Sequence, residues 1–348
     1  MSPVTHSAPG TRTAVISGIG VSLPARLVKN EEVAERLGVT ADWIRERTGI
    51  EQRHLVDPEG ATSDLAVEAG RRALDACGNP PVDFLILATC TPDHTFPSTA
   101  PAVASRLGLA GIAAFDLNAA CSGFVYGLSA GAGMLASGAY GTGLIIGADA
   151  ISTIVDHDDR ITAPIFGDGA GAVVVRAGTA DEPGSLLAQT LGSDGDLLDI
   201  LVTPAGGSRQ RSALSAADPE RSYLGMQGRL VYRHAIARMA EASVDVLAKT
   251  GWAVEDVDRL VAHQANRRIL AATAKQIGLP EDRAVINVDR VANTSGASIP
   301  LALMDAMGSG ELKAGDKVLL AAFGGGVTWA AATLIWPDLP PVAPADSI

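Results

Sequence analysis

Short hydrophobic runs alternate with amphipathic stretches along the chain. The runs are rich in aliphatic and β-branched residues, and they lie at residues 84–88, 144–147, 173–176, 260–262 and 318–322. Continuous apolar runs of this length predict strands that are buried on both faces of a sheet. Between them, residues 66–77 predict a helix, and so do residues 124–135, where Phe124, Leu128, Gly131 and Leu135 share one helical face. The alternation of strands and helices predicts an α/β fold.

Two blocks of sequence recur in the same order at nearly the same separation. The segment that starts at Ala73 resembles the one that starts at Val246, and the segment around Cys121 resembles the one around Asn293. A chance similarity between alanine-rich helices is the alternative. We predict two duplicated halves, residues 12–180 and 181–336, with flexible ends at 1–11 and 337–348. The composition of residues 181–228, rich in Gly, Ser, Asp and Pro, predicts a loop that separates the halves or covers a site between them.

Composition and charge narrow the class of protein. Of the 348 residues, 47% are hydrophobic and 19% are charged, which is typical of a globular chain and excludes a disordered one. Three cysteines provide no disulfide framework, and no leader-like or membrane-spanning pattern is visible, so we expect a cytoplasmic location without membrane association. The net charge of −12 disfavours nucleic acid as a partner.

Cys121 is the candidate nucleophile. It lies after a short apolar segment and directly before the helix predicted at residues 124–135, with small neighbours in Ser122 and Gly123. The start of a helix stabilises a thiolate, so this position predicts a lowered pKa and a reactive sulfur. For an arbitrary cysteine a core position is the more common role, and we assign that role to Cys77, in the middle of a predicted helix, and to Cys90, just beyond a strand.

His263 and Asn293 are the candidate partners of Cys121. His263 lies at the carboxyl end of a predicted strand, where open α/β sheets place their sites, whereas most histidines in such positions are structural. Asn293 is within a residue of the position equivalent to Cys121 in the second block. If the two halves pack around a pseudo-twofold axis, the three residues converge.

A run of three glycines, residues 324–326, follows the last predicted strand. Such a run usually means a tight turn, and no phosphate-binding lysine or dinucleotide motif accompanies it. Its backbone N–H groups, that of Gly325 in particular, suit an oxyanion hole shared with the Cys121 amide. Phe323 suits an apolar wall of the site or, equally, a core aromatic.

Five motifs carry a resemblance to a known family. They are ACSGF at Cys121, HQANRRI at His263, NTSGAS at Asn293, FGDGAGA at Phe166 and AFGGG at Phe323. Together they resemble β-ketoacyl-acyl-carrier-protein synthase III of the thiolase superfamily, over nearly the whole chain. The resemblance implies a thiolase-like five-layered αβαβα fold and a homodimer. It also implies that an acyl-CoA primer acylates Cys121, and that a decarboxylative Claisen condensation with malonyl-acyl carrier protein then initiates fatty acid or polyketide synthesis, without a metal or a redox cofactor.

The resemblance also implies binding residues. Trp43, Arg47 and Arg160 match the family's coenzyme A contacts, and Phe96 matches a residue that reaches across the dimer into the partner's acyl tunnel. Arg233, Arg268 and Lys275 match the residues that dock the carrier protein. Their segment, residues 227–275, has more basic than acidic residues in a chain that is acidic as a whole, although a solvated helical face is the plainer interpretation of a small excess.

Two residues depart from the family pattern, and three alternative functions stay open. Val327 replaces an aromatic residue and Leu230 an acidic one, which puts the choice of primer in doubt. An acyltransferase of the same family that moves the acyl group to a hydroxyl or an amine is the first alternative. A papain-like cysteine protease fits the order Cys, His, Asn, but the surroundings of Cys121 argue against it. A noncatalytic binding protein would not need all five motifs.

Overall fold

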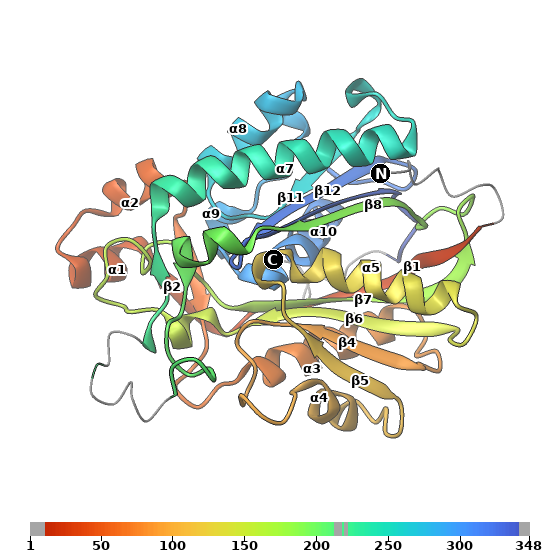
Figure 1. The fold of residues 1–348 in the computed structure, drawn as a ribbon, viewed down its shortest axis with the longest axis horizontal. Helices are drawn as coiled ribbons and strands as arrows, with labels where there is room; N and C mark the ends of the chain where they lie inside the picture. Colours follow the sequence, from red (N-terminus) through yellow and green to blue (C-terminus); the bar gives the residue numbers. More distant parts are fainter. Residues whose placement is uncertain (1–10, 212–217, 219–221, 341–348) are drawn as a thin grey trace.

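The computed structural model describes residues 11–211, 218 and 222–340 (Figure 1). Parts of the predicted flexible ends, residues 1–10 and 341–348, lie outside this range. The helices are α1 (Asn30–Leu37), α2 (Ala41–Thr48), α3 (Thr62–Ala76), α4 (Ala100–Arg106), α5 (Gly123–Ala136), α7 (Gly228–Thr250), α8 (Arg267–Ile277), α9 (Val288–Val291) and α10 (Ser298–Gly308). Outside the two main sheets, β2 (Arg26–Lys29) pairs with β3 (Gln52–Leu55), and β9 (Leu201–Val202) pairs with β10 (Gly225–Met226).

The first main sheet has the strand order β1-β7-β6-β4-β5. Its strands are β1 (Arg12–Ser22), β7 (Gly169–Thr179), β6 (Thr142–Asp149), β4 (Phe84–Ala88) and β5 (Ala113–Leu117). The pairings β1–β7 and β7–β6 are antiparallel, and β6–β4 and β4–β5 are parallel. All five residues of β4 are buried, as its continuous apolar run predicts. Burial of each such large side chain stabilises the fold by about 1.5–3 kcal/mol.

The second main sheet repeats this order of pairings. Its strands are β8 (Leu186–Ser193), β13 (Thr328–Ile335), β12 (Lys317–Gly324) and β11 (Arg259–Ala262). The pairings β8–β13 and β13–β12 are antiparallel, and β12–β11 is parallel. A parallel bridge between Leu260 and Ala284 continues the sheet beyond β11, in the place that β5 takes in the first sheet.

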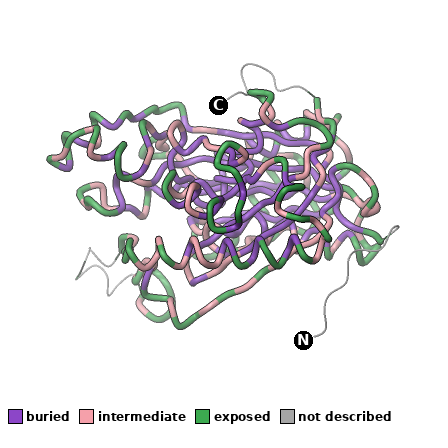
Figure 2. The backbone as a smooth tube through the Cα atoms, turned by 90° about the horizontal axis from the view of Figure 1, so that it is seen from above, coloured by how far each residue is buried: buried purple, intermediate pink, exposed green. Residues whose placement is uncertain are grey.

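Helices cover both sheets and fill the space between them (Figure 1). One hydrophobic cluster joins α5 and α10 to the facing sides of the two sheets. A second cluster packs α7 and α8 on the outer side of the second sheet, and a third packs α3 and α4 on the outer side of the first. Figure 2 shows the buried segments gathered along the middle of the molecule. Each sheet thus packs against helices on both faces, which explains why its central strands, such as β4, β6 and β12, are continuously apolar.

The predicted strands and helices all lie within elements of the structure, and three details differ. Residues 186–193 form strand β8, although the sequence predicts them as part of a loop. The prediction fails there because polar and small residues, such as Gln189 and Gly192, are typical of a loop. Cys77 caps the end of α3 instead of lying inside it. Pro337 is buried and Leu339 packs against the core, so residues 337–339 are held although the sequence predicts a flexible end. No described helix has the length and apolar character that crossing a bilayer requires.

Candidate active site

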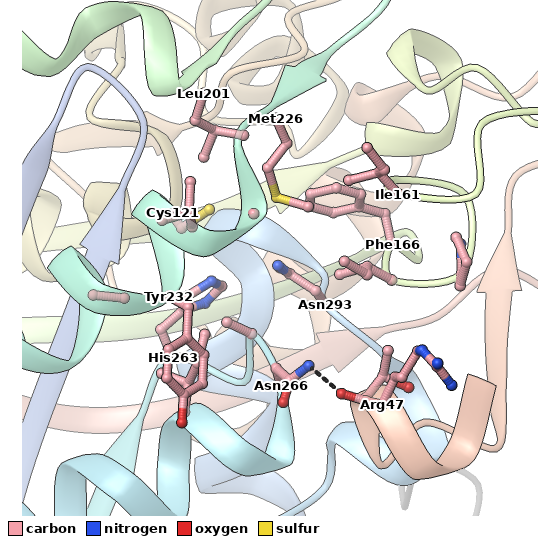
Figure 3. A pocket seen from close by; sticks show the side chains of 18 of the residues that line it. Arg47, Cys121, Ile161, Phe166, Leu201, Met226, Tyr232, His263, Asn266 and Asn293 are labelled. Carbon is pink, nitrogen blue, oxygen red and sulfur yellow. Dashed lines mark hydrogen bonds between the residues drawn. The ribbon is translucent and has the colours of Figure 1, made fainter. Parts of the chain in front are cut away.

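One cavity of about 250 Å³ brings the three predicted reactive residues together (Figure 3). Cys121, His263 and Asn293 all line it. Cys121 lies in the 3₁₀ turn η1 (Ala120–Ser122) that leads into α5, His263 follows β11, and Asn293 precedes the turn η7 (Ser295–Ala297). In Figure 3 the amide nitrogen of Asn293 and the ring of His263 point toward the space beside Cys121. We call these three residues the cavity floor.

The hairpin of β12 and β13 packs closely against the turn that holds Cys121. A Cβ atom on Gly324 would lie 2.7 Å from the amide nitrogen of Cys121, so only glycine permits this approach. The hydroxyl of Thr328 donates to the carbonyl oxygen of Ala119 at 2.8 Å. Between these contacts Ala120 has a φ of 47°, a conformation that residues with a Cβ atom rarely adopt. The hairpin therefore packs directly against the turn of Cys121 and is hydrogen-bonded to it.

Burial governs the acidity of the Cys121 thiol. Removal from water raises its pKa to about 12, and a hydrogen bond to Ser295 opposes the rise. The sequence predicted a lowered pKa from the position of Cys121 before α5, and this prediction is wrong for the resting protein. The physical reason is that desolvation of the sulfur anion outweighs the hydrogen bonds from Ser295 and from the Cys121 backbone, which favour the thiolate.

His263 is neutral in this environment. Its side chain is buried, and burial lowers the pKa of the imidazole to about 3. Nδ1 lies 3.0 Å from the hydroxyl oxygen of Ser298. Because the uncharged ring carries one hydrogen, it can donate a hydrogen bond to a substrate without bringing a charge into the cavity.

The side chain of Asn293 is held by a backbone amide two residues further along the chain. The amide of Ser295 donates to Oδ1 of Asn293 at 2.9 Å, which assigns the other side-chain atom as the nitrogen. Nδ2 of Asn293 accordingly faces the cavity with its hydrogens available (Figure 3). The cavity floor thus presents the thiol of Cys121 and two nitrogen donors, one on Asn293 and one on His263.

The residues that match the family's coenzyme A contacts line the same cavity. Trp43, Arg47 and Arg160 lie on its outer part, which we call the cavity mouth. The guanidinium carbon of Arg47 is 4.3 Å from the centre of the Trp43 ring, and Nε of Arg160 donates to the carbonyl oxygen of Leu37 at 2.9 Å. Nδ2 of Asn266 donates to the carbonyl oxygen of Arg47 at 3.0 Å, which ties α8 to α2 (Figure 3).

Apolar side chains that the sequence did not identify as site residues form much of the wall. They include Ile161, Phe166, Leu201, Met226 and Met239. They come from loops and elements far apart in the chain, and no periodic pattern marks them. Phe166 had a signal, since it begins one of the five motifs. Phe323, predicted as an apolar wall or as a core residue, is buried and lines the cavity.

Other predicted residues lie outside the cavity wall. Phe96 is 89% exposed on the surface of this chain. Arg233, Arg268 and Lys275 are exposed on α7 and α8, and the last two flank a shallow groove. A Cβ atom on Gly325 would lie 3.1 Å from the carbonyl oxygen of Leu201, so this glycine also permits a close approach.

The two departures from the family pattern take different positions. Val327 is fully buried, and its backbone pairs in both directions with that of Asp194. Leu230 is half-buried on α7. Neither lines the described cavity wall.

Family models match two segments of the chain. The model of 3-oxoacyl-acyl-carrier-protein synthase III matches residues 115–195, and the model of its C-terminal part matches residues 247–336. The chain is 54% identical over 325 residues to β-ketoacyl-acyl-carrier-protein synthase III 5 of Streptomyces coelicolor, which covers 93% of this chain and 98% of the relative.

Solved structures give the same match. The 3-oxoacyl-acyl-carrier-protein synthase III of Pseudomonas aeruginosa has a TM-score of 0.89 and 43% identity, covering 94% of this chain and 100% of that one. The priming β-ketosynthase of the R1128 polyketide pathway has a TM-score of 0.87 and 34% identity, covering 96% and 99%.

The fold and the similarity to these relatives identify the protein as an acyltransferase with an α/β fold. The chain belongs to the β-ketoacyl-acyl-carrier-protein synthase III family, and its reaction is the initiating condensation of fatty acid or polyketide synthesis. Membership of this family implies an acyl-CoA and malonyl-acyl carrier protein as its substrates.

Proposed function

We propose that Cys121 accepts the primer acyl group and that His263 and Asn293 serve the condensation that follows. One observation carries this proposal: a thiol and two N–H donors converge in a single apolar cavity whose mouth is cationic. In the first half-reaction, the sulfur of Cys121 attacks the acyl-CoA thioester, and its proton passes to the departing sulfur of coenzyme A. The backbone N–H groups of Cys121 and Gly325 hold the oxyanion, and coenzyme A leaves with the proton.

The second half-reaction uses the two N–H donors. His263 and Asn293 hold the thioester carbonyl of malonyl-acyl carrier protein, so that loss of carbon dioxide leaves an enolate stabilised by two hydrogen bonds. The enolate carbon attacks the acyl group on Cys121, and the sulfur leaves and regains a proton. Phe323 disfavours the malonyl carboxylate because a charged group loses its hydration beside an apolar wall. A neutral His263 suits this role, since its hydrogen bond strengthens as the oxygen becomes negative.

The charges outside the cavity floor suit anionic substrates. Arg47 and Arg160 at the cavity mouth bind the phosphates of coenzyme A, and Trp43 stacks on the adenine. Arg233, Arg268 and Lys275 dock the acidic carrier protein, with the groove between Arg268 and Lys275 on α8 as its contact. These cations reverse the sign of the chain's overall charge where the substrates must approach.

The fold supports a duplicated, thiolase-like architecture and a homodimer. The repeated order of pairings in the two main sheets, with helices outside and between them, fits two related halves in a five-layered αβαβα arrangement. Strand β5 lies at the edge of its sheet with Phe115 37% exposed, and an edge strand of this kind is commonly covered by a partner. The exposed Phe96 then enters the acyl cavity of the second copy.

Release of carbon dioxide from carboxyl-labelled malonyl-acyl carrier protein, in the presence of an acyl-CoA, tests the proposed function. We expect stoichiometric release of carbon dioxide and a β-ketoacyl-carrier protein that mass spectrometry identifies. Transfer of the acyl group to an added alcohol or amine, without carbon dioxide release, would instead establish the acyltransferase alternative.

A further inference from the structure

Ser298, at the start of α10, joins the histidine of the cavity floor to the backbone beside it. Its side chain is fully buried. The hydroxyl oxygen lies 3.0 Å from Nδ1 of His263 and accepts a hydrogen bond from the amide of Gln264 at 2.6 Å. In the part of the chain that the structure describes, these two are its partners.

The hydrogen-bonding capacity of a hydroxyl group decides the direction of the first contact. A serine side chain has one hydrogen to donate and two lone pairs. The Gln264 amide occupies one lone pair, so the hydrogen must find an acceptor. If Nδ1 of His263 carried the imidazole hydrogen, the buried Ser298 hydroxyl would have no described acceptor, which is unfavourable. The favourable arrangement sends the Ser298 hydrogen to an unprotonated Nδ1.

The side chain of Gln264 anchors the backbone amide that donates to the Ser298 hydroxyl. The side chain of Gln264 is buried and donates from Nε2 to the carbonyl oxygens of Ala262 and Val285, at 2.9 and 3.0 Å. Its Oε1 accepts from the amide of Asn287 at 3.0 Å. Two short segments of backbone, at residue 262 and at residues 285–287, therefore hold Gln264 in place, with its amide directed at Ser298.

We propose that Ser298 is a positioning residue that sets the tautomer of His263, so that Nε2 carries the hydrogen and presents it to the substrate carbonyl. This inference rests on the proposed donor role of His263. Asn293 is oriented in the same way, since Oδ1 is occupied by the Ser295 amide and Nδ2 is left to donate. One stretch of chain, residues 293–298, thus orients both donors of the cavity floor.

The tautomer is directly measurable in the unmodified protein. Long-range proton–nitrogen correlation spectra of protein labelled with ¹⁵N-histidine distinguish a protonated nitrogen from an unprotonated one, and His263→Gln assigns the signal among the six histidines. We expect the resonance of an unprotonated Nδ1 and a protonated Nε2. A wild-type spectrum with the hydrogen on Nδ1 would overturn the proposal without any substitution.

Substitution of Ser298 connects the tautomer to the reaction. In Ser298→Ala we expect both tautomers in the spectrum and a loss of malonyl decarboxylation on the order of tenfold, smaller than the loss on removing a donor altogether. Acylation of Cys121 should stay within about twofold, since that half-reaction does not use His263. Ser298→Thr keeps the hydroxyl and should restore the single tautomer and the decarboxylation rate.

Two outcomes distinguish the positioning role of Ser298 from the donor role of His263. If Ser298→Ala keeps the wild-type tautomer and decarboxylates at the wild-type rate, Ser298 does not position His263. If His263→Ala itself decarboxylates normally, the donor role of His263 fails, whatever its tautomer.

Discussion

The floor and the mouth of the cavity hold their polar groups in different ways. On the floor, His263 and Asn293 are buried, and each is bonded to a residue of the segment 293–298. At the mouth, Arg47 and Arg160 are exposed and donate hydrogen bonds to backbone carbonyl oxygens, and neither forms an ion pair with a described carboxylate.

This difference in burial assigns the chemical steps to the floor and the binding of substrate to the mouth. Buried hydrogen bonds are insensitive to salt and fix geometry, so we expect the floor to set the rates of the two half-reactions. Exposed, unpaired cations act over roughly 10 Å at moderate ionic strength, so we expect the mouth to set affinity and salt dependence. Substitutions in the two regions should therefore differ in both kind and size.

Removal of the nucleophile should have the largest effect. Cys121→Ala should retain no label from a radioactive acyl-CoA after denaturation and gel filtration, because no other described side chain that lines the cavity is a cysteine. Cys77→Ala, at the end of α3 and outside the cavity, is the matched control and should label as the wild type does. Full labelling of the Cys121→Ala protein would remove Cys121 from the mechanism.

Loss of either donor on the floor should come next. His263→Ala and Asn293→Ala should each lower malonyl decarboxylation by about a hundredfold or more, the usual cost of deleting an oxyanion donor. Single-turnover acylation should persist in both, because that step uses backbone donors. The reverse pattern, with acylation lost and decarboxylation kept, would exchange the roles we assign.

The acidity of the Cys121 thiol predicts how fast the floor reacts at each pH. Since burial raises the pKa of Cys121 to about 12, the thiolate fraction rises with pH throughout the neutral range. Alkylation by iodoacetamide, corrected with Cys121→Ala, should accelerate by about tenfold per pH unit between pH 7 and 9. A plateau near neutral pH would mean that the start of α5 prevails over burial after all.

Substitution at the mouth should change affinity more than rate. Arg47→Ala should raise the KM for acyl-CoA by several-fold, roughly the value of a solvent-exposed contact between arginine and phosphate, and leave the maximal acylation rate within about twofold. The increase should shrink as salt is added. Arg45→Ala is the control, because Arg45 lies on the same helix but pairs with Asp42 and does not line the cavity. Equal effects of the two substitutions would contradict a specific role of Arg47.

The docking surface should give the smallest effect. Arg268→Glu should weaken the use of malonyl-acyl carrier protein by a few-fold, most strongly at low ionic strength, and leave acylation by acyl-CoA nearly unchanged. Lys313→Glu, before the amino end of β12 and so at the opposite end of that strand from Cys121, provides a change of equal charge. If both variants use the carrier protein as well as wild type does at low salt, the docking site lies elsewhere.

The sequence predicted the residues of the floor better than their environment. Cys121, His263 and Asn293 follow strands or precede helices, and such positions leave a readable local pattern. The pKa of Cys121 depends on how completely distant segments exclude water, and no local pattern reports this. The same holds for Leu201 and Met226 in the wall, which come from the short strands β9 and β10. Strand β8 was missed because its small and polar residues are typical of a loop.

The role of Cys121 as carrier of the acyl group is tested most directly by following that group through both half-reactions on the wild-type protein. After incubation with acyl-CoA, proteolysis and mass spectrometry should find the acyl mass on the peptide that contains Cys121. A chase with malonyl-acyl carrier protein should remove that mass as the β-ketoacyl product forms. Acylation of a peptide that contains Cys77 or Cys90 instead, or an acyl-Cys121 that persists while product accumulates, would show that Cys121 does not carry the acyl group to the product.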